Sequence, residues 1–388
     1  MIEQALQPAF PARELESRRT RLTQEMARRK LDGLVVAVPE NIYYLTGLDH
    51  WGFFACHVLL VPVEGPMILV ARAMERITYE NQVNNAEFIG FGDAGDPADA
   101  MVAGLKQLHL DRAAVGLEKN SLFLTLRIGE NLQAKTPDID WSDASGLLDG
   151  IRLVQSPLEQ GYTRKAAAAA DAGTLAAIEA LRDGASDYQV AAECHRAMIL
   201  AGSEYPGFGP FIRPTRRLGE EHTTWRGDVF RRGDAAFLEV GAAYRKYQAP
   251  MGRLVFIGSA PELAAEAAEL AIRGMTAIQE AVRPGATGND VYEAWQGVAD
   301  AAGLGHYRRH HCGYLVGIGF PPSWTGGSMV TSLRPGSALE LKPGMAFHLH
   351  SWFTNTGRGD YFVSNTALLT EQGCEILTSR TPQELQIR

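Results

Sequence analysis

The second half of this sequence predicts an α+β domain with a curved antiparallel sheet, because its strand-like runs are grouped apart from its helical ones. Two apolar runs come first, two long helical patterns follow, and three more apolar runs come last. We expect the helices to cover the sheet. The expected strands are 235–241, 253–258, 314–319, 345–350 and 361–369, and the expected helices are 261–282 and 288–302.

The first 150 residues alternate strands with helices, which predicts a smaller mixed α/β domain. In the segment 14–30, leucine and methionine recur at helical spacing among charged residues. The other expected elements are helices at 97–108 and 122–134, a short turn or helix at 41–45, and strands at 33–38, 57–63, 67–71, 87–91 and 113–117.

A well-marked helix start separates the two halves. The segment Ser156-Pro-Leu-Glu159 supplies a capping serine, a proline at the first helical position and a glutamate at the third. It predicts an alanine-rich helix that ends near Leu181, followed by a second helix at 187–200. The chain of 388 residues is longer than single hydrophobic cores usually grow, so we expect two domains, 1–153 and 154–388.

The composition excludes several classes of protein. A net charge of −8 without any cluster of lysine and arginine argues against a nucleic-acid partner. No apolar run is long enough to cross a membrane, and the N-terminus lacks the features of a signal peptide. The four cysteines lie far apart, which is typical of reduced thiols in the cytoplasm. We therefore expect a cytoplasmic protein.

One carboxylate, Glu239, stands among apolar neighbours in the first strand of the expected sheet. A lone acid in such a strand is costly unless it is paired or takes part in chemistry. We expect this strand to form a hairpin through a turn at Gly241–Arg245. His222 lies in a polar loop before it, and a histidine facing a glutamate is a common acid–base pair near neutral pH. The alternatives are a satisfied buried glutamate and an ordinary loop histidine.

Further polar residues lie in the later strands. His348 and His350 point to the same face of a strand, which fits either half of a metal site or a polar cleft. Arg253 is expected to clamp a substrate carboxylate or to act as a structural partner. A metal site needs at least three converging ligands, and no second carboxylate accompanies Glu239. No dinucleotide fingerprint or phosphate loop is present, so we expect neither a metal nor a cofactor.

The order of these landmarks resembles the creatinase/aminopeptidase P family over almost the whole chain. The segments that carry the resemblance are 31–36, 41–47, 152–159, 232–241, 333–336 and 341–345. The resemblance implies a C-terminal pita-bread domain, which is a curved antiparallel sheet covered by helices, and a smaller N-terminal creatinase-like domain.

The resemblance also implies a departure from the metallopeptidases of this family, which bind two metal ions through two Asp, one His and two Glu. The corresponding positions here are Glu239, Pro250, Tyr314, His350 and Asn365. Proline and tyrosine there imply one of the metal-free branches, which hydrolyse C–N bonds of small cationic compounds. The segments 237–247 and 312–324 resemble the ectoine hydrolases, with Glu239 on their proposed nucleophilic glutamate. By the same resemblance, His222 falls on the acid–base histidine of the family.

The resemblance thus implies a metal-independent hydrolase of an amidine or amide C–N bond in a small zwitterion. The expected catalytic residues are Glu239, His222, Tyr314 and His350. The expected substrate-binding residues are Trp51, Phe53, Phe54, Arg253, His348, Asn365 and Trp324. In the resembling dimers the N-terminal loop reaches the partner's active site, which implies a homodimer. The alternatives are a creatinase-like guanidine hydrolase, a catalytically inactive binding protein, and a metallopeptidase with unusual ligands.

Overall fold

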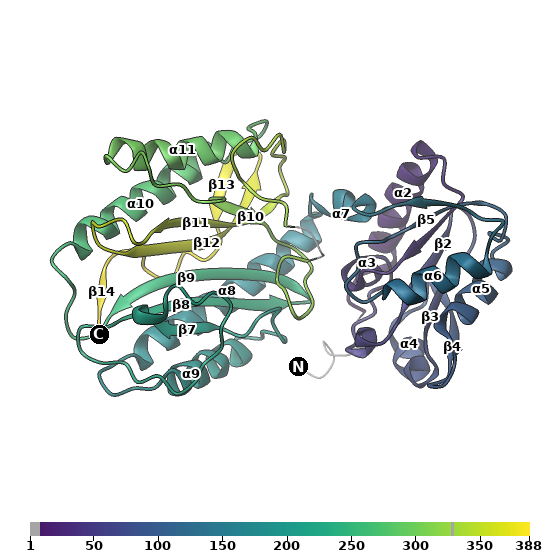
Figure 1. Cartoon of the computed structure of the whole chain (residues 1–388), viewed down its shortest axis with the longest axis horizontal. Helices are drawn as coiled ribbons and strands as arrows, with labels where there is room; N and C mark the ends of the chain where they lie inside the picture. The colour runs from purple at the N-terminus through teal and green to yellow at the C-terminus, as the bar shows by residue number, and fades with distance from the viewer. Residues whose placement is uncertain (1–7, 327–329) are drawn as a thin grey trace. The chain divides into compact units, whose positions relative to one another are not determined.

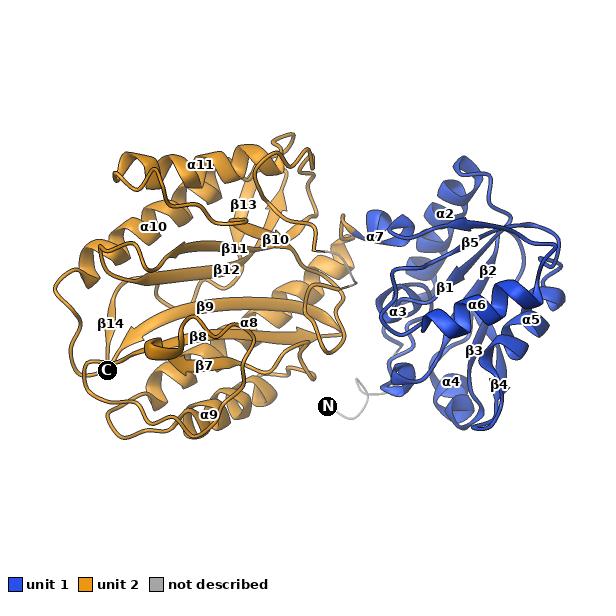
Figure 2. Cartoon of the chain, in the orientation of Figure 1, with its two compact units in different colours: residues 1–152 blue, residues 153–388 orange. Residues whose placement is uncertain are grey.

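The computed structural model describes residues 8–326 and 330–388 (Figure 1). The chain forms two compact units, Met1–Arg152 and Leu153–Arg388 (Figure 2). The division falls one residue before the expected boundary. No helix among the described residues is long and apolar enough to cross a membrane.

Unit 1 is a mixed α/β domain around a six-stranded sheet with the strand order β4-β3-β2-β1-β5-β6. β2 pairs antiparallel with β1 and β3, and the other neighbours are parallel. The strands are β1 (Gly33–Val36), β2 (Val58–Pro62), β3 (Met67–Arg72), β4 (Ala86–Phe91), β5 (Ala114–Leu117) and β6 (Asp140–Asp143). The helices are α2 (Ala12–Arg28), α3 (Pro39–Thr46), α4 (Arg76–Gln82), α5 (Pro97–Gln107), α6 (Leu126–Lys135) and α7 (Leu147–Arg152).

Strand β6 was not expected from the sequence. Its four residues, Asp-Trp-Ser-Asp, have no buried member, and the strand lies at the edge of the sheet. An edge strand that buries little carries no apolar alternation, so its sequence does not distinguish it from a loop.

Unit 2 contains an eight-stranded sheet in which the order β10-β11-β12-β9-β8-β7 forms the main path, with β13 on β12 and β14 on β9. All pairings are antiparallel except that of β14 with β9. The strands are β7 (Phe211–Pro214), β8 (Ala235–Tyr244), β9 (Tyr247–Phe256), β10 (Gly313–Leu315), β11 (Ala346–Phe353), β12 (Tyr361–Thr370), β13 (Gly373–Ile376) and β14 (Gln386–Ile387). The helices are α8 (Pro157–Ala180), α9 (Asp187–Leu200), α10 (Ala264–Ala281) and α11 (Gly288–Ala301). This architecture confirms the expected fold class.

The start of α8 follows the expected capping box. The Ser156 hydroxyl accepts a hydrogen bond from the Glu159 N–H, and the Glu159 carboxylate accepts one from the Ser156 N–H. Each side chain thereby satisfies a backbone donor that the first helical turn leaves open.

The helices of unit 2 pack on one face of the sheet, which we call the outer face. Helices α8 and α9 share a core with Leu238, Val240 and Met251. Gly274 of α10 lies against Ser351 and Phe353. The side chains that alternate with these along each strand point to the opposite, inner face. Polar residues in these otherwise apolar strands are therefore available to a ligand only on the inner face.

The hairpin of β8 and β9 turns at Arg245 and Lys246, not at Gly241–Arg245 as expected. Both turn residues have positive φ angles, 49° and 64°, as the tightest hairpin turns require. Gly241 instead lies within β8 and pairs with Pro250. A Cβ atom at position 241 would lie 2.7 Å from the ring of Trp324. The glycine therefore serves the close approach of this ring, not a turn.

We expect Gly241→Ala to displace the Trp324 ring and to destabilise the protein by about 1–3 kcal/mol, as overpacking typically does. The shift should appear in tryptophan fluorescence and in the midpoint of denaturant unfolding. The matched control is Gly297→Ala in helix α11, where no atom lies within 4 Å of the added methyl group. Equal midpoints for Gly241→Ala and the wild type would contradict the steric argument.

Candidate active site

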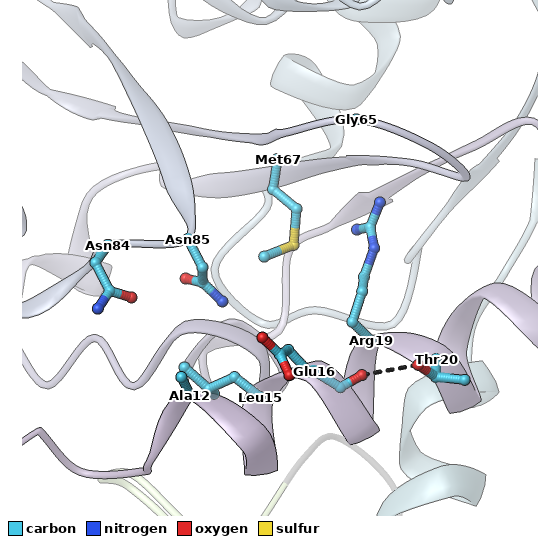
Figure 3. A pocket seen from close by; sticks show the side chains of 9 residues that line it. All are labelled: Ala12, Leu15, Glu16, Arg19, Thr20, Gly65, Met67, Asn84 and Asn85. Carbon is cyan, nitrogen blue, oxygen red and sulfur yellow. Dashed lines mark hydrogen bonds between the residues drawn. The ribbon is translucent and has the colours of Figure 1, made fainter.

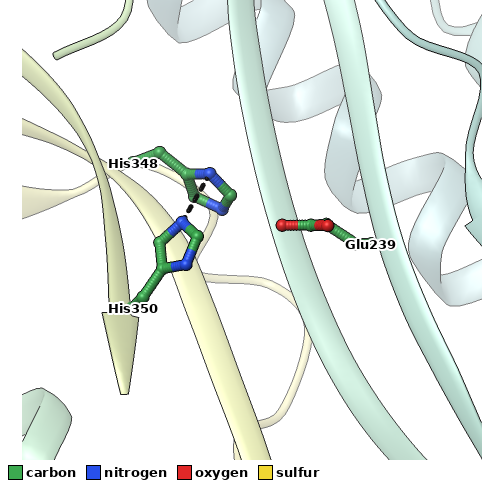
Figure 4. A group of neighbouring side chains, drawn as sticks. All are labelled: Glu239, His348 and His350. Carbon is green, nitrogen blue, oxygen red and sulfur yellow. Dashed lines mark hydrogen bonds between the residues drawn. The ribbon is translucent and has the colours of Figure 1, made fainter. Parts of the chain in front are cut away.

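A row of paired residues crosses the inner face of the unit 2 sheet. His350 of β11 pairs with Ser364, Ser364 with Gly252, Gly252 with Glu239, and Glu239 with Phe211 of β7. The two residues between His350 and Glu239 are small, so these side chains can lean toward each other above them. Figure 4 shows Glu239 directed at His348 and His350, and the ligand atoms of the three residues lie within 4.8 Å of one another.

The histidines belong to a buried hydrogen-bond network. His348 Nδ1 lies 2.8 Å from both the Tyr314 hydroxyl and His350 Nε2, and its Nε2 lies 2.8 Å from Ser364 Oγ. The indole N–H of Trp324 donates to the Tyr314 oxygen at 2.8 Å. Because an indole N–H can only donate, this bond fixes one lone pair of Tyr314. The network therefore orients Tyr314 and His350.

This network borders a cavity of about 450 Å³. Five of the expected site residues line it: His222, Glu239, Tyr314, Trp324 and His350. The full lining is Phe208, Glu221, His222, Glu239, Arg309, His310, His311, Tyr314, Ser323, Trp324, Thr325, Val330, His350 and Trp352. Aromatic walls with a few convergent polar groups are typical of a site for a small molecule.

His222 reaches the cavity from the loop before β8. Its φ angle of 52° is uncommon for a residue with a side chain, and such backbone conformations cluster at functional sites. The imidazole is stacked on Phe208 at a centroid distance of 6.0 Å and an interplanar angle of 18°. The backbone conformation of the loop and the ring of Phe208 together hold the His222 imidazole at the cavity.

Burial sets the protonation of this site. It raises the pKa of Glu239 to about 7, against the opposing effect of the positive charge of Arg213. Burial also lowers the pKa of His348 and of His350 well below the usual range, and the neighbouring imidazoles add to this effect. Near neutral pH, Glu239 therefore exchanges a proton readily while the two histidines are neutral, as suits a base or nucleophile beside hydrogen-bonding groups.

The structure corrects the expectation that Arg253 binds substrate. Its side chain is fully buried. The guanidinium donates hydrogen bonds to the carbonyls of Gly252, Ser364, Thr381 and Pro382, and to Oδ1 of Asn365. Arg253 also lies opposite Leu238, on the outer face. It is therefore the structural partner that the sequence left as an alternative.

Asn365 is likewise not a cavity residue. It pairs with Leu349 and so belongs to the outer face, where its Oδ1 accepts hydrogen bonds from Arg253 and Thr378. The inner-face residue at this point of β12 is Ser364. When a strand is aligned with the family one residue out of step, each of its residues is assigned to the opposite face of the sheet. This is why Asn365 was expected in the site in place of Ser364.

The other expected binding residues are dispersed. His348 is fully buried behind the cavity wall, where it orients Tyr314 and His350. Phe53 is buried within unit 1 and contacts Phe123 edge to face. Trp51 and Phe54 are exposed on unit 1, with exposed fractions of 50% and 72%.

Several lining residues were not anticipated as site residues. Phe208 packs edge to face on Trp324, and Trp352 carries the guanidinium of Arg309 above its ring. The run Arg309-His310-His311 was a visible signal, because three adjacent cationic or imidazole side chains before a strand are unusual on a structural loop. Nothing in the sequence marked Phe208 or Trp352.

A second hollow, of about 530 Å³, lies on unit 1 (Figure 3). It is lined by Ala12, Leu15, Glu16, Arg19, Thr20, Gly65, Met67, Asn84 and Asn85. This lining contains no histidine or cysteine and only one carboxylate, Glu16, so it does not offer the acid–base pair found in unit 2.

The fold and the site define a two-domain enzyme with a curved antiparallel sheet and a half-buried acid beside histidines. The chain belongs to metallopeptidase family M24 and is a hydrolase of that family: the family model matches residues 161–371, and the model of the creatinase/prolidase N-terminal domain matches residues 18–154. These matches confirm the family expected from the sequence.

Relatives of two kinds are similar over nearly the full length. The ectoine hydrolase of Halomonas elongata is 27% identical over 98% of both chains. The Xaa-Pro dipeptidase of Pyrococcus furiosus is 23% identical over 96% of this chain and all of its own. The solved Xaa-Pro dipeptidase from Bacillus anthracis superposes with a TM-score of 0.83 at 20% identity, covering 96% of this chain and all of that one. This last likeness shows the fold.

The family name implies metal ions. The side chains of this site do not provide the four carboxylates and one histidine that hold two metal ions in the metallopeptidases of the family. Of the family's expected ligand positions only Glu239 is a carboxylate, Pro250 has no donor, and the inner face of β12 carries Ser364. In the described part of the chain, one group, Glu239 with His348 and His350, could hold a single ion. Both ring nitrogens of His348 are already hydrogen-bonded, Nδ1 to Tyr314 and His350 and Nε2 to Ser364.

Proposed function

We propose that this protein is a metal-independent hydrolase that cleaves a C–N bond in a small zwitterion, of the cyclic amidine type that ectoine represents. The observation that carries the proposal is Glu239, a carboxylate with a pKa near 7 that faces an aromatic cavity in place of a two-ion cage. An amidinium carbon is already polarised by its own cation. It therefore needs a base or nucleophile more than a metal ion.

The proposed chemistry assigns one task to each group. Glu239 attacks the amidinium carbon, or takes a proton from the water that attacks it. The C–N bond then breaks, and His222 gives a proton to the departing nitrogen. Tyr314 and His350 hydrogen-bond the tetrahedral centre, and the network behind them keeps both in place. Where Glu239 attacks directly, water then adds to the same carbon and the bond to Glu239 breaks, which restores the carboxylate. In either route one water is consumed, and the ring opens to an amide and an amine.

The exposed aromatic residues of unit 1 have a place in this proposal. Trp51 and Phe54 lie three residues apart in one loop and present large apolar side chains to solvent, where they could contact another chain. We propose that the protein is a cytoplasmic homodimer in which this loop supplies an aromatic wall to the partner's cavity. Trp51→Ala should then raise KM for the substrate.

The experiment measures product release from ectoine and from creatine, before and after dialysis against a chelator. We expect hydrolysis of ectoine that is unaffected by chelation. Turnover of creatine alone would shift the assignment to a guanidine hydrolase. Turnover of neither compound would overturn the proposal.

A metal-dependent dipeptidase is the second candidate, because Glu239, His348 and His350 converge closely enough to contact one ion. Metal analysis of freshly purified protein, combined with an Ala-Pro hydrolysis assay, separates the two. Stoichiometric metal together with a loss of activity on chelation would favour the dipeptidase and contradict metal independence.

A further inference from the structure

The cavity contains a guanidinium that the proposed chemistry does not use. Arg309 is half-buried in the loop between α11 and β10 and lines the cavity together with Glu239. Its guanidinium carbon lies 4.6 Å from the centroid of the Trp352 ring, and the Tyr292 hydroxyl donates to its backbone carbonyl at 2.8 Å. The ring and the backbone anchor therefore hold the side chain at the cavity.

Among the described residues, no hydrogen bond or ion pair engages this guanidinium. Its neighbour Arg308 differs, because it pairs with Asp300 at 3.2 Å and does not line the cavity. Arg253 differs as well, since protein oxygens surround its guanidinium. A guanidinium presents a planar fork of donors that matches a carboxylate, so an unengaged one beside a reactive centre indicates an anionic ligand group.

His311 supplies a second donor, two residues along the chain from Arg309. Its Nδ1 is buried and has no partner in the described residues, although the side chain lines the cavity. A buried polar atom without a partner is costly, and a ligand oxygen would satisfy it. Arg309 and His311 thus add donors to a lining in which Glu221 and Glu239 are the carboxylates.

We propose that Arg309 binds the carboxylate of the substrate, with His311 Nδ1 as a second donor, and so restricts this enzyme to substrates that carry a carboxylate. This assignment rests on the proposed function for the position of the scissile bond at Glu239. It replaces Arg253 as the carboxylate-binding residue. The guanidinium of Arg309 orients the substrate, so that the carbon of its scissile C–N bond faces Glu239 and His222.

The test measures binding by calorimetry in the Glu239→Gln background, which is expected to suppress turnover. The probes are two matched pairs, ectoine with its carboxamide and Ala-Pro with its amide. We expect the carboxylate member of at least one pair to bind about 10- to 100-fold more tightly, as a charge-assisted bidentate contact allows. Adding Arg309→Gln should remove this preference, whereas adding Arg308→Gln should leave it unchanged.

Each outcome decides the proposal. A preference for the carboxylate that survives Arg309→Gln would overturn it, and so would the absence of any preference in both pairs. Equal weakening of both members of a pair would show a packing role for Arg309 and overturn it as well. Because these are binding measurements, they stay informative if ectoine and creatine are not hydrolysed. Failure of the proposed function is therefore distinguishable from failure of this assignment.

Discussion

We expect Glu239→Gln to lower kcat by about 10³-fold or more and to leave the fold intact. The amide has the size of the carboxylate but can neither attack the substrate carbon nor accept a proton from water. The measurement is the rate of product release at saturating ectoine, with circular dichroism as the check on folding. Near-normal turnover by the variant would contradict the role given to Glu239.

The same variant also alters how stability depends on pH. The pKa of Glu239 rises from 4.5 to about 7 in the folded protein, so the folded state binds this proton more tightly than the unfolded chain does. The stability that this proton contributes is complete below pH 4.5 and is lost as the pH rises through 7. Glutamine does not titrate, so we expect the variant to melt at a higher temperature than the wild type at pH 8. The difference should shrink toward pH 4.5.

Arg253→Gln is expected to destabilise the protein by about 3 kcal/mol or more. The substitution removes the donor shared by four backbone carbonyls and Asn365, and each buried acceptor left without a partner costs about 1–3 kcal/mol. Denaturant unfolding measures the loss. Poor expression would agree with this expectation.

The control for this variant is Arg309→Gln, which removes a guanidinium that makes no hydrogen bond or ion pair with the described residues and should leave the unfolding midpoint nearly unchanged. If Arg253→Gln instead unfolded like the wild type and bound substrate weakly, Arg253 would be a ligand-binding residue after all. The pair of variants thus separates an arginine that holds the sheet together from one that faces the cavity.

Much of the fold could be predicted from local patterns. The capping box at Ser156 and the apolar runs of β8 and β12 are local signals, and they located the domain start and the sheet. The short elements β6 and β14 bury little surface and left no pattern. The hairpin turn was misplaced because Gly241 was interpreted as a turn residue, although a glycine also permits close packing.

Part of the site was also predictable from local sequence patterns. Glu239 is conspicuous because it is the acid in an apolar strand, and His348 and His350 are conspicuous by their spacing. Which residues of neighbouring strands lie beside them depends on register, which a single sequence does not contain. Asn365 was therefore chosen in place of Ser364, and Arg253 was expected to bind substrate although it lies on the outer face. Arg309 comes from a loop whose path only the tertiary structure shows.

The contact between Gly241 and Trp324 links the hairpin backbone to the reactive centre. Trp324 holds the Tyr314 oxygen, and its ring has space only because position 241 lacks a side chain. We therefore expect positions 241 and 324 to be epistatic, which means that the effect of a substitution at one depends on the residue at the other. A side chain at 241 becomes tolerable only after the ring at 324 has been replaced by a smaller one, and that replacement first removes the indole that orients Tyr314. Changes in substrate range should therefore accumulate at Phe208 and Arg309 while this pair stays fixed.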